Sequence, residues 1–157
     1  MRGAVASAAI TYDMKGRTMN STTRQSIISA IGRILMATIF VFSGIGKALA
    51  PAATMGYIQS AGLPFASLAL AGAIAVEAGG GLLLVLGIRT RLVAALLAAF
   101  SLVTAFAFHS AIGDQNQLIH LLKNIALTGG LLQVVAFGAG ACSVDAARGR
   151  TAAPHAA

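Results

Sequence analysis

Charged side chains are scarce in this chain. They make up 10% of its 157 residues, against about 25% in a typical soluble domain. The hydrophobic fraction is 57% and the mean hydropathy is +0.84. This balance excludes an ordinary soluble domain and indicates a polytopic membrane protein, while the length predicts one domain.

Cysteine and nucleic-acid-binding motifs are also lacking. Cys142 is the only cysteine, which excludes an internal disulfide and any cysteine cluster for a metal ion. The net charge of +7 would suit nucleic acid, but no basic helix and no interleaving of aromatic and basic residues is present. We therefore expect no metal site and no nucleic-acid partner, and we expect Cys142 to be inert.

Four apolar segments are long enough to cross a bilayer, whose hydrocarbon core of about 30 Å needs roughly 20 helical residues. They are Ile27–Leu49, Phe65–Ile88, Leu92–Phe108 and Leu118–Phe137. Pro51–Leu63 is too short and too polar to span and predicts a helix lying at the membrane interface. The predicted fold is all-α: an integral membrane antiparallel four-helix bundle with a short interfacial helix between spans 1 and 2.

Lysine and arginine are distributed unevenly around these spans. Lys47 and Lys123 lie at one membrane face. Eight basic residues lie at the other, namely Arg2, Lys15, Arg17, Arg24, Arg89, Arg91, Arg148 and Arg150. Because basic loops stay inside, we expect a bacterial inner-membrane protein with both termini in the cytoplasm.

The ends of the chain are predicted to be tails. Residues 1–24 predict a flexible cytoplasmic N-terminal tail, 25–140 the membrane domain and 141–157 a cytoplasmic C-terminal tail. The first segment has a short, alanine-rich apolar run and no cleavage site, so it does not match a signal peptide. Its methionines leave three start positions open, Met1, Met14 and Met19.

Glu77 is the only acid inside a predicted span, and it lies near the middle of Phe65–Ile88. A carboxylate at the bilayer centre costs about 3 kcal/mol on the insertion scale, so it needs a partner or a proton. Lys47 and Lys123 both approach from the same membrane face. Two interpretations stay open: a structural ion pair, or a proton acceptor or hydrogen-bond partner for a bound ligand.

More polar residues gather at this face when the helices are placed antiparallel. His109 ends the third span, and His120 and Asn124 begin the fourth. We predict a pocket in the outer half of the bundle, with Gln59 of the interfacial helix above it. The candidate ligand-binding residues are Glu77, Lys47, Lys123, His120, Asn124 and His109.

Arg33 and several glycines are candidates for structural roles. Arg33 and Lys47 lie on one helical stripe, and we favour two cations that snorkel to the two interfaces. The alternative is that Lys47 turns inward toward Glu77. Small residues around Glu77 predict close helix packing. The structural candidates are Arg33, Gly44, Gly80, Gly81, Gly129 and Gly130.

The histidines and lysines are the residues that could bind a cofactor. His109 and His120 suggest bis-histidine haem ligation, but neither lies in the hydrophobic middle of a span, so ordinary interfacial histidines are favoured. Lysine and histidine hydrogen-bond quinone carbonyls, so a quinone is one candidate ligand, while the cofactor is left open. No cysteine pair, haem motif or flavin motif supplies an electron carrier, so electrons would come from a partner.

The order of short motifs resembles the DoxX family of small four-span bacterial membrane proteins. The matching elements lie within residues 31–145: Arg33, Ser43-Gly44-Ile45-Gly46-Lys47, Gly62, Pro64, Glu77, Gly80-Gly81, Leu86-Gly87, Thr90-Arg91, His109, Lys123-Asn124, Gly129-Gly130, Gly138-Ala139-Gly140, Ser143 and Asp145. The chain departs at Ala139, where the family often has proline.

The resemblance implies a membrane protein associated with redox systems. Relatives include a subunit of a thiosulfate:quinone oxidoreductase and members that assemble with thiol- and superoxide-handling enzymes, while distant relatives are cargo receptors. The first hypothesis is a non-haem membrane subunit that binds a quinone-like ligand and has a redox enzyme as partner. The alternative is a non-catalytic scaffold or small-solute carrier with Glu77 as a structural lock. Catalysis and homo-oligomer formation are left open by the sequence.

Overall fold

The structure is a computed structural model that describes residues 21–152, and no strand occurs within that range. Its helices are α2 (Ser21–Leu49), α3 (Pro51–Ser60), α4 (Ala66–Ile74), the π-helical η1 (Ala75–Gly79), α5 (Gly80–Leu86), α6 (Thr90–Phe108), α7 (Gln115–Phe137) and α8 (Val144–Ala152). Four stretches are long and apolar enough to span a membrane: α2, the continuous α4–η1–α5, α6 and α7. The predicted fold class is confirmed. The flexible tail was predicted over residues 1–24, but residues 21–24 form the first turn of α2. Residues 1–20, with the three candidate start methionines, lie outside the described residues.

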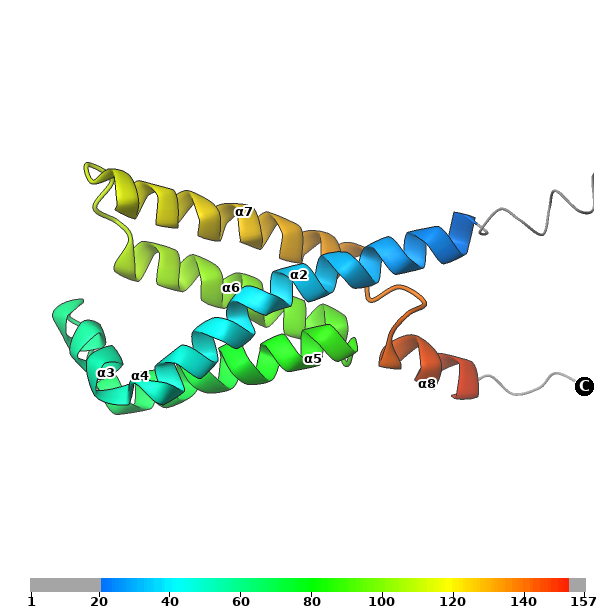
Figure 1. Ribbon diagram of the computed structural model, residues 1–157, viewed down its shortest axis with the longest axis horizontal. Helices are drawn as coiled ribbons and strands as arrows, with labels where there is room; N and C mark the ends of the chain where they lie inside the picture. The colour runs from blue at the N-terminus through cyan, green and yellow to red at the C-terminus, as the bar shows by residue number, and fades with distance from the viewer. Residues whose placement is uncertain (1–20, 153–157) are drawn as a thin grey trace, which may run out of the picture.

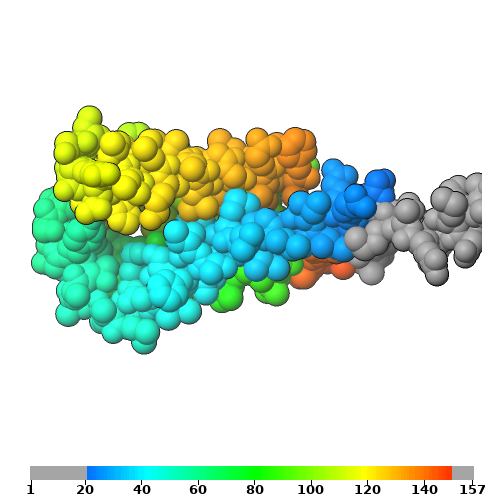
Figure 2. Space-filling view, turned by 45° about the horizontal axis from the view of Figure 1, so that its top comes forward, coloured from blue at the N-terminus to red at the C-terminus, as the bar shows by residue number. Residues whose placement is uncertain are grey.

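The four spans form two packed groups. α6 packs most extensively against its antiparallel neighbour α7, while α2 packs on η1 and α5 and crosses the bundle diagonally (Figure 1). α3 lies at one end, which we call the α3 end, and α8 lies at the opposite α8 end (Figure 1). α2 and α7 border one another along the face seen in Figure 2.

The buried core is small and lies where the spans cross. Its fully buried members include Ala37, Leu84, Leu97 and Leu131. Many large apolar side chains point outward instead; Phe42, for example, is 80% exposed. Outward apolar side chains are what a lipid environment requires of a spanning helix, so the surface supports the membrane assignment.

Glycine allows α2 to approach η1 and α5 closely. A Cβ on Gly44 would lie 2.6 Å from the backbone nitrogen of Ala78, and one on Gly81 would lie 2.7 Å from Val41 Cγ2. Both positions therefore exclude side chains, as at small-residue helix interfaces in membranes. A Cβ on Gly129 would meet nothing within 4 Å, so this predicted structural glycine makes no close contact.

The other two candidate glycines face flexible side chains. A Cβ on Gly80 would lie 3.2 Å from Leu97 Cδ2, and one on Gly130 would lie 2.9 Å from the Met36 sulfur. The far end of a methionine can move, so Gly130 is less restrictive than Gly44 or Gly81.

Arg33 ties the α8 end together. Its side chain is 1% exposed, and its guanidinium donates to the carbonyls of Leu84, Val85 and Cys142 at 2.7, 3.2 and 2.7 Å. The snorkelling interpretation is therefore wrong for Arg33. The last carbonyls of a helix lack the regular intrahelical hydrogen bonds. The Leu84 carbonyl accepts one from the Gly87 nitrogen at 3.3 Å, and Arg33 supplies a shorter second one.

Two elements were not predicted. The second span has a π-helical turn, η1, which contains Glu77, whereas we expected a regular helix. The C-terminal segment, predicted only as a tail, contains α8, and the Asp145 carboxylate accepts hydrogen bonds of 2.8 Å from the backbone nitrogens of Arg89 and Thr90. α8 thereby holds the α5–α6 turn, where Gly87 has φ +68° and faces Ser143.

Candidate functional site: the Lys47–Glu77 cavity

Glu77 forms an ion pair with Lys47 inside the bundle. Lys47 Nζ lies 2.7 Å from Oε2 and 3.0 Å from Oε1 of Glu77. Ser43, one turn before Lys47 on α2, accepts a hydrogen bond from Lys47 Nζ at 2.6 Å and donates one to Glu77 Oε1 at 3.1 Å. Lys47 therefore turns inward, as the alternative interpretation held.

The two partners of this pair differ in accessibility. The Glu77 side chain is 8% exposed and that of Lys47 is 27% exposed. Glu77 lies on the π-turn, and such turns widen a helix locally and are frequent at functional sites. The acid is thus held at a fixed depth, while the lysine can still reach a second partner.

Two buried oxygen atoms beside the pair lack regular hydrogen bonds. Glu77 Oε2 contacts Lys47 Nζ but accepts no hydrogen bond of regular geometry, and Ser101 Oγ on α6 has no partner. Ser101 is 1% exposed. Buried polar atoms normally have partners, so these two are positions at which a bound molecule could supply one.

A cavity of about 390 Å³ adjoins these atoms and lies among α2, α3, α4, η1, α6 and α7. This volume falls within the roughly 300–1,000 Å³ of small-molecule sites. Its walls are mostly apolar, with Phe40, Ala73 and Phe100 among them. The polar side chains that line it are those of Ser43, Lys47, Thr54, Tyr57, Glu77, Ser101, Thr104, His109 and Asn124.

α3 covers the α3 end of this cavity. Ile58 is buried against α4, and the Tyr57 ring stacks on Phe108 of α6 with centroids 5.2 Å apart. Gln59, expected above the pocket, is exposed and is not among the lining residues. The cover is therefore aromatic and apolar, with Thr54 and Tyr57 as its polar members.

Four of the six predicted ligand-binding residues line the cavity: Lys47, Glu77, His109 and Asn124. Lys123 and His120 do not, and both are exposed. Lys123 precedes Asn124 by one residue, and a step of about 100° along a helix turns it away when Asn124 faces inward.

His120 contacts another histidine instead. Its ring stacks on that of His109 with centroids 4.9 Å apart, and His109 Nδ1 lies 2.7 Å from Gln117 Oε1. Within residues 21–152, no group of three or more His, Cys, Asp or Glu side chains could hold a metal ion.

Sequence reasoning missed the α6 side of the site. Ser101 and Thr104 are the hydroxyl residues within the apolar run of the third span, three positions apart and so on one helical face. That spacing was the available signal, but we treated the span only as uncharged. Tyr57, on the helix predicted to lie at the interface, is part of the cover.

The fold and the site together define a class: a four-span integral membrane protein with an intramembrane Lys–Glu pair beside a mostly apolar cavity. Comparison with known proteins narrows the class. The DoxX family model matches residues 28–110, more than half of the chain. The chain belongs to the DoxX family.

Two relatives of this chain are both named inner membrane proteins. The chain is 38% identical over 115 residues to the inner membrane protein YqjF of Escherichia coli (strain K12), across 73% of this chain and 87% of the relative. It is 32% identical over 126 residues to the inner membrane protein YphA of the same organism, across 76% and 89%. No solved structure matches the chain. With its four apolar helices, it is an integral inner-membrane protein.

Proposed function

We propose that this DoxX-family protein binds a quinone-like ligand in the Lys47–Glu77 cavity. The observation that carries the proposal is the pair of incompletely bonded oxygens, Glu77 Oε2 and Ser101 Oγ, beside a mostly apolar cavity of about 390 Å³. A quinone head group has two carbonyl oxygens on an apolar ring. Ser101 and Lys47 offer donors for the carbonyls, and the aliphatic walls suit the ring.

The proposed role is that of a membrane subunit in a redox system. A quinone becomes a quinol by taking two electrons and two protons. The electrons would come from a partner redox enzyme, and the protons would reach the quinone oxygens beside Lys47 and Glu77. In this role Glu77 would take a proton from Lys47, whose ammonium donates to it at 3.0 Å, and pass the proton to a quinone oxygen.

Ligand titration tests this proposal. The purified full-length protein in neutral detergent is equilibrated with a short-tailed ubiquinone analogue, and bound analogue is measured by equilibrium dialysis. Ser101→Ala should weaken binding about fivefold to tenfold, because a net hydrogen bond is worth roughly 1 to 1.5 kcal/mol. Glu77→Gln should weaken it at least about tenfold, because Lys47, a proposed donor to the quinone, loses the charged partner that holds it beside the cavity.

The matched control is Ser110→Ala. Ser110 is exposed in the α6–α7 loop and does not line the cavity, so its replacement should leave binding unchanged. Absence of saturable binding by the wild type would contradict the proposal. So would equal affinities in the wild type and the two cavity variants.

The ion pair itself favours a second candidate function: a non-catalytic scaffold or small-solute carrier in which Glu77 is a structural lock. The pair joins α2 to η1 through two short Lys47–Glu77 contacts and the Ser43 bridge. Removing one member of a buried pair leaves the other charge uncompensated. A lock therefore predicts that stability, and not ligand affinity, responds to substitution.

A double-mutant cycle distinguishes the two functions. Lys47→Met, Glu77→Gln and the double variant are compared by thermal unfolding in detergent. A coupling of about 1–3 kcal/mol with unchanged quinone affinity in Glu77→Gln would support the lock alone. Reduced affinity in a Glu77→Gln protein that is still folded would support the ligand site.

A further inference from the structure

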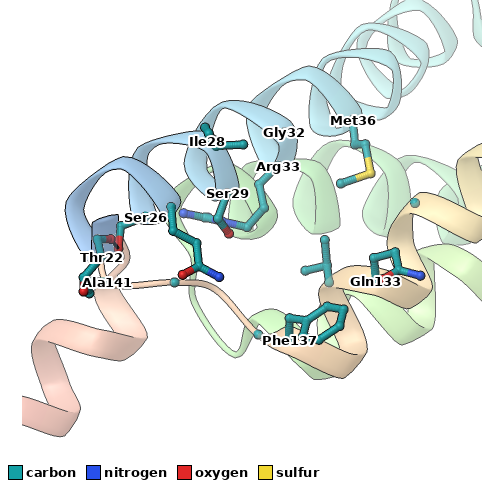
Figure 3. A pocket seen from close by; sticks show the side chains of 15 residues that line it. Thr22, Ser26, Ile28, Ser29, Gly32, Arg33, Met36, Gln133, Phe137 and Ala141 are labelled. Atoms are coloured by element: carbon teal, nitrogen blue, oxygen red, sulfur yellow. Dashed lines mark hydrogen bonds between the residues drawn. The ribbon is translucent and has the colours of Figure 1, made fainter. Parts of the chain in front are cut away.

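A second hollow lies at the α8 end, between the first half of α2 and the last turns of α7 (Figure 3). Its volume is about 550 Å³, and it shares no lining residue with the Lys47–Glu77 cavity. Thr22, Ser26 and Ser29 line it from α2, and Gln133 and Phe137 line it from α7 (Figure 3). We call it the Arg33 groove.

Arg33 places a buried positive charge beside this groove, and Asp145 attracts that charge through space without contacting it. Arg33 is 1% exposed and is one of the residues that line the groove. Its three hydrogen bonds go to neutral carbonyls, its Nε has no partner, and among the described residues no carboxylate contacts it. Coulomb attraction is strong where water is excluded, so the groove favours an anionic group near Arg33.

Several polar lining residues lie toward the start of α2, and apolar ones lie deeper. Thr22, Gln25 and Ser29 lie toward the start of α2, whereas Met36 and Val134 lie deeper in the bundle. α2 has 29 residues, and at about 1.5 Å each it is roughly 43 Å long, longer than the hydrocarbon core of about 30 Å. Its first turns therefore reach headgroup level while Met36 lies among acyl chains.

We propose that the Arg33 groove binds one anionic glycerophospholipid of the leaflet at the α8 end. The phosphate would lie over Arg33 near Gln25 and Ser29, and one acyl chain would lie between α2 and α7. Charge around the groove fits this occupant. Arg24 is close by on α2, and the Arg91 side chain lies against Gly138, which lines the groove.

The experiment compares two lipids of equal chain length by native mass spectrometry. Full-length protein in neutral detergent is titrated with phosphatidylglycerol or with phosphatidylcholine. The wild type should retain one phosphatidylglycerol at least about fivefold more tightly, since one charge at a headgroup surface carries about this factor. Equal retention of the two lipids would overturn the proposal.

Two exposed glutamines on opposite walls allow substitution without disturbing Arg33. Gln25→Glu and Gln133→Glu keep the side-chain size but place a negative charge in the groove. Each should weaken phosphatidylglycerol retention about fivefold and leave phosphatidylcholine unchanged. The matched control, Gln59→Glu, lies exposed on α3 outside both hollows and should change neither.

Inorganic phosphate separates a lipid site from a free-anion site. Excess phosphate should not displace the retained phosphatidylglycerol, because it lacks the acyl chain that contacts Met36 and Phe137. Displacement by phosphate alone would overturn the lipid assignment, as would undiminished retention in both groove variants. The quinone site lies elsewhere, so either proposal can fail without the other.

Discussion

The two ends of the bundle each bury one charged side chain, and they do so differently. At the α8 end, Arg33 is held by three backbone carbonyls and is 1% exposed. At the α3 end, Glu77 is held by side chains only, those of Ser43 and of Lys47, which is 27% exposed beside a cavity. Backbone carbonyls cannot exchange partners without unfolding, whereas a lysine can. We infer that Arg33 stabilises the fold, whereas Glu77 belongs to a site whose side-chain contacts can change.

The few acidic residues also divide into those that stabilise the fold and the one beside the cavity. Of the four in the chain, Asp114 accepts a hydrogen bond from the backbone of Gln117 at the start of α7, and Asp145 caps the start of α6. Both are helix caps, which stabilise helix N-termini by about 1 kcal/mol. Of the acids in residues 21–152, Glu77 is the one within a span.

The largest expected effect tests the structural role of Arg33. Arg33→Met removes the donors for three carbonyls at the α8 end. Charged hydrogen bonds contribute about 1.5–3 kcal/mol each and are not additive, so we expect a loss of about 3–4 kcal/mol in the free energy of unfolding. Unfolding by sodium dodecyl sulfate in mixed micelles, followed by circular dichroism, measures it.

Arg24→Met is the control for this prediction, because Arg24 lies on the same helix and is exposed. It should change stability by less than about 0.5 kcal/mol. If Glu77→Gln destabilised the protein more than Arg33→Met, the roles assigned to the two ends would have to be exchanged.

The next effect concerns helix approach beside Glu77. Gly44→Ala places a Cβ 2.6 Å from the backbone nitrogen of Ala78, the neighbour of Glu77. Because backbone cannot give way locally, α2 and η1 must separate, and we expect a loss of about 1–3 kcal/mol. Quinone affinity, measured as above, should fall with it because the Lys47–Glu77 contact is strained.

Gly129→Ala is the matched control on α7. Its added methyl group meets nothing within 4 Å, and alanine favours helix by up to about 1 kcal/mol over glycine. The variant should be as stable as the wild type or slightly more stable. A Gly44→Ala protein that unfolds like Gly129→Ala would show that close approach at Gly44 is not required.

Much of the fold could be predicted from the sequence because membrane spans depend on length and apolarity alone. The span from Leu92 to Phe108 was expected within two residues of its observed start at Thr90. The segment containing α8 could not be recognised, since it is too polar to suggest packing. Its position depends on Asp145 meeting the start of α6, a contact between residues 55 positions apart.

The sequence could predict which helices contribute residues to the site, but not which side chains on each helix face the cavity. Lys47 could be named as one of two candidate partners for Glu77, because both lysines approach from the same membrane face, although we favoured a Lys47 that snorkels to the interface. The choice between Lys123 and Asn124 depends on a rotation of about 100°, which periodicity does not resolve where polar residues are adjacent. No pattern of residues around Glu77 distinguishes a π-helical turn from a regular α-helix, so the sequence could not predict this turn.

The smallest effect is a pH dependence at the α8 end. Hydrogen bonds to Asp145, first that from the Thr90 backbone and also those from the Thr90 side chain and the Arg89 backbone, lower the pKa of its carboxyl below the ordinary value of 3.8. A lowered pKa means that the ionised form stabilises the fold. This contribution is complete above about pH 5 and is lost as the pH falls through the folded-state pKa.

Asp145→Asn isolates this contribution. At about pH 6 the variant should be less stable by roughly 1 kcal/mol, because one amide oxygen replaces a carboxylate that accepts from Arg89 and Thr90. Unfolding midpoints in neutral detergent, measured from about pH 6 to pH 3, should draw closer for the two proteins as the pH falls. A difference that stayed constant with pH would mean that Asp145 acts by shape alone. The α8 end would then be held by Arg33 and not by charge on α8.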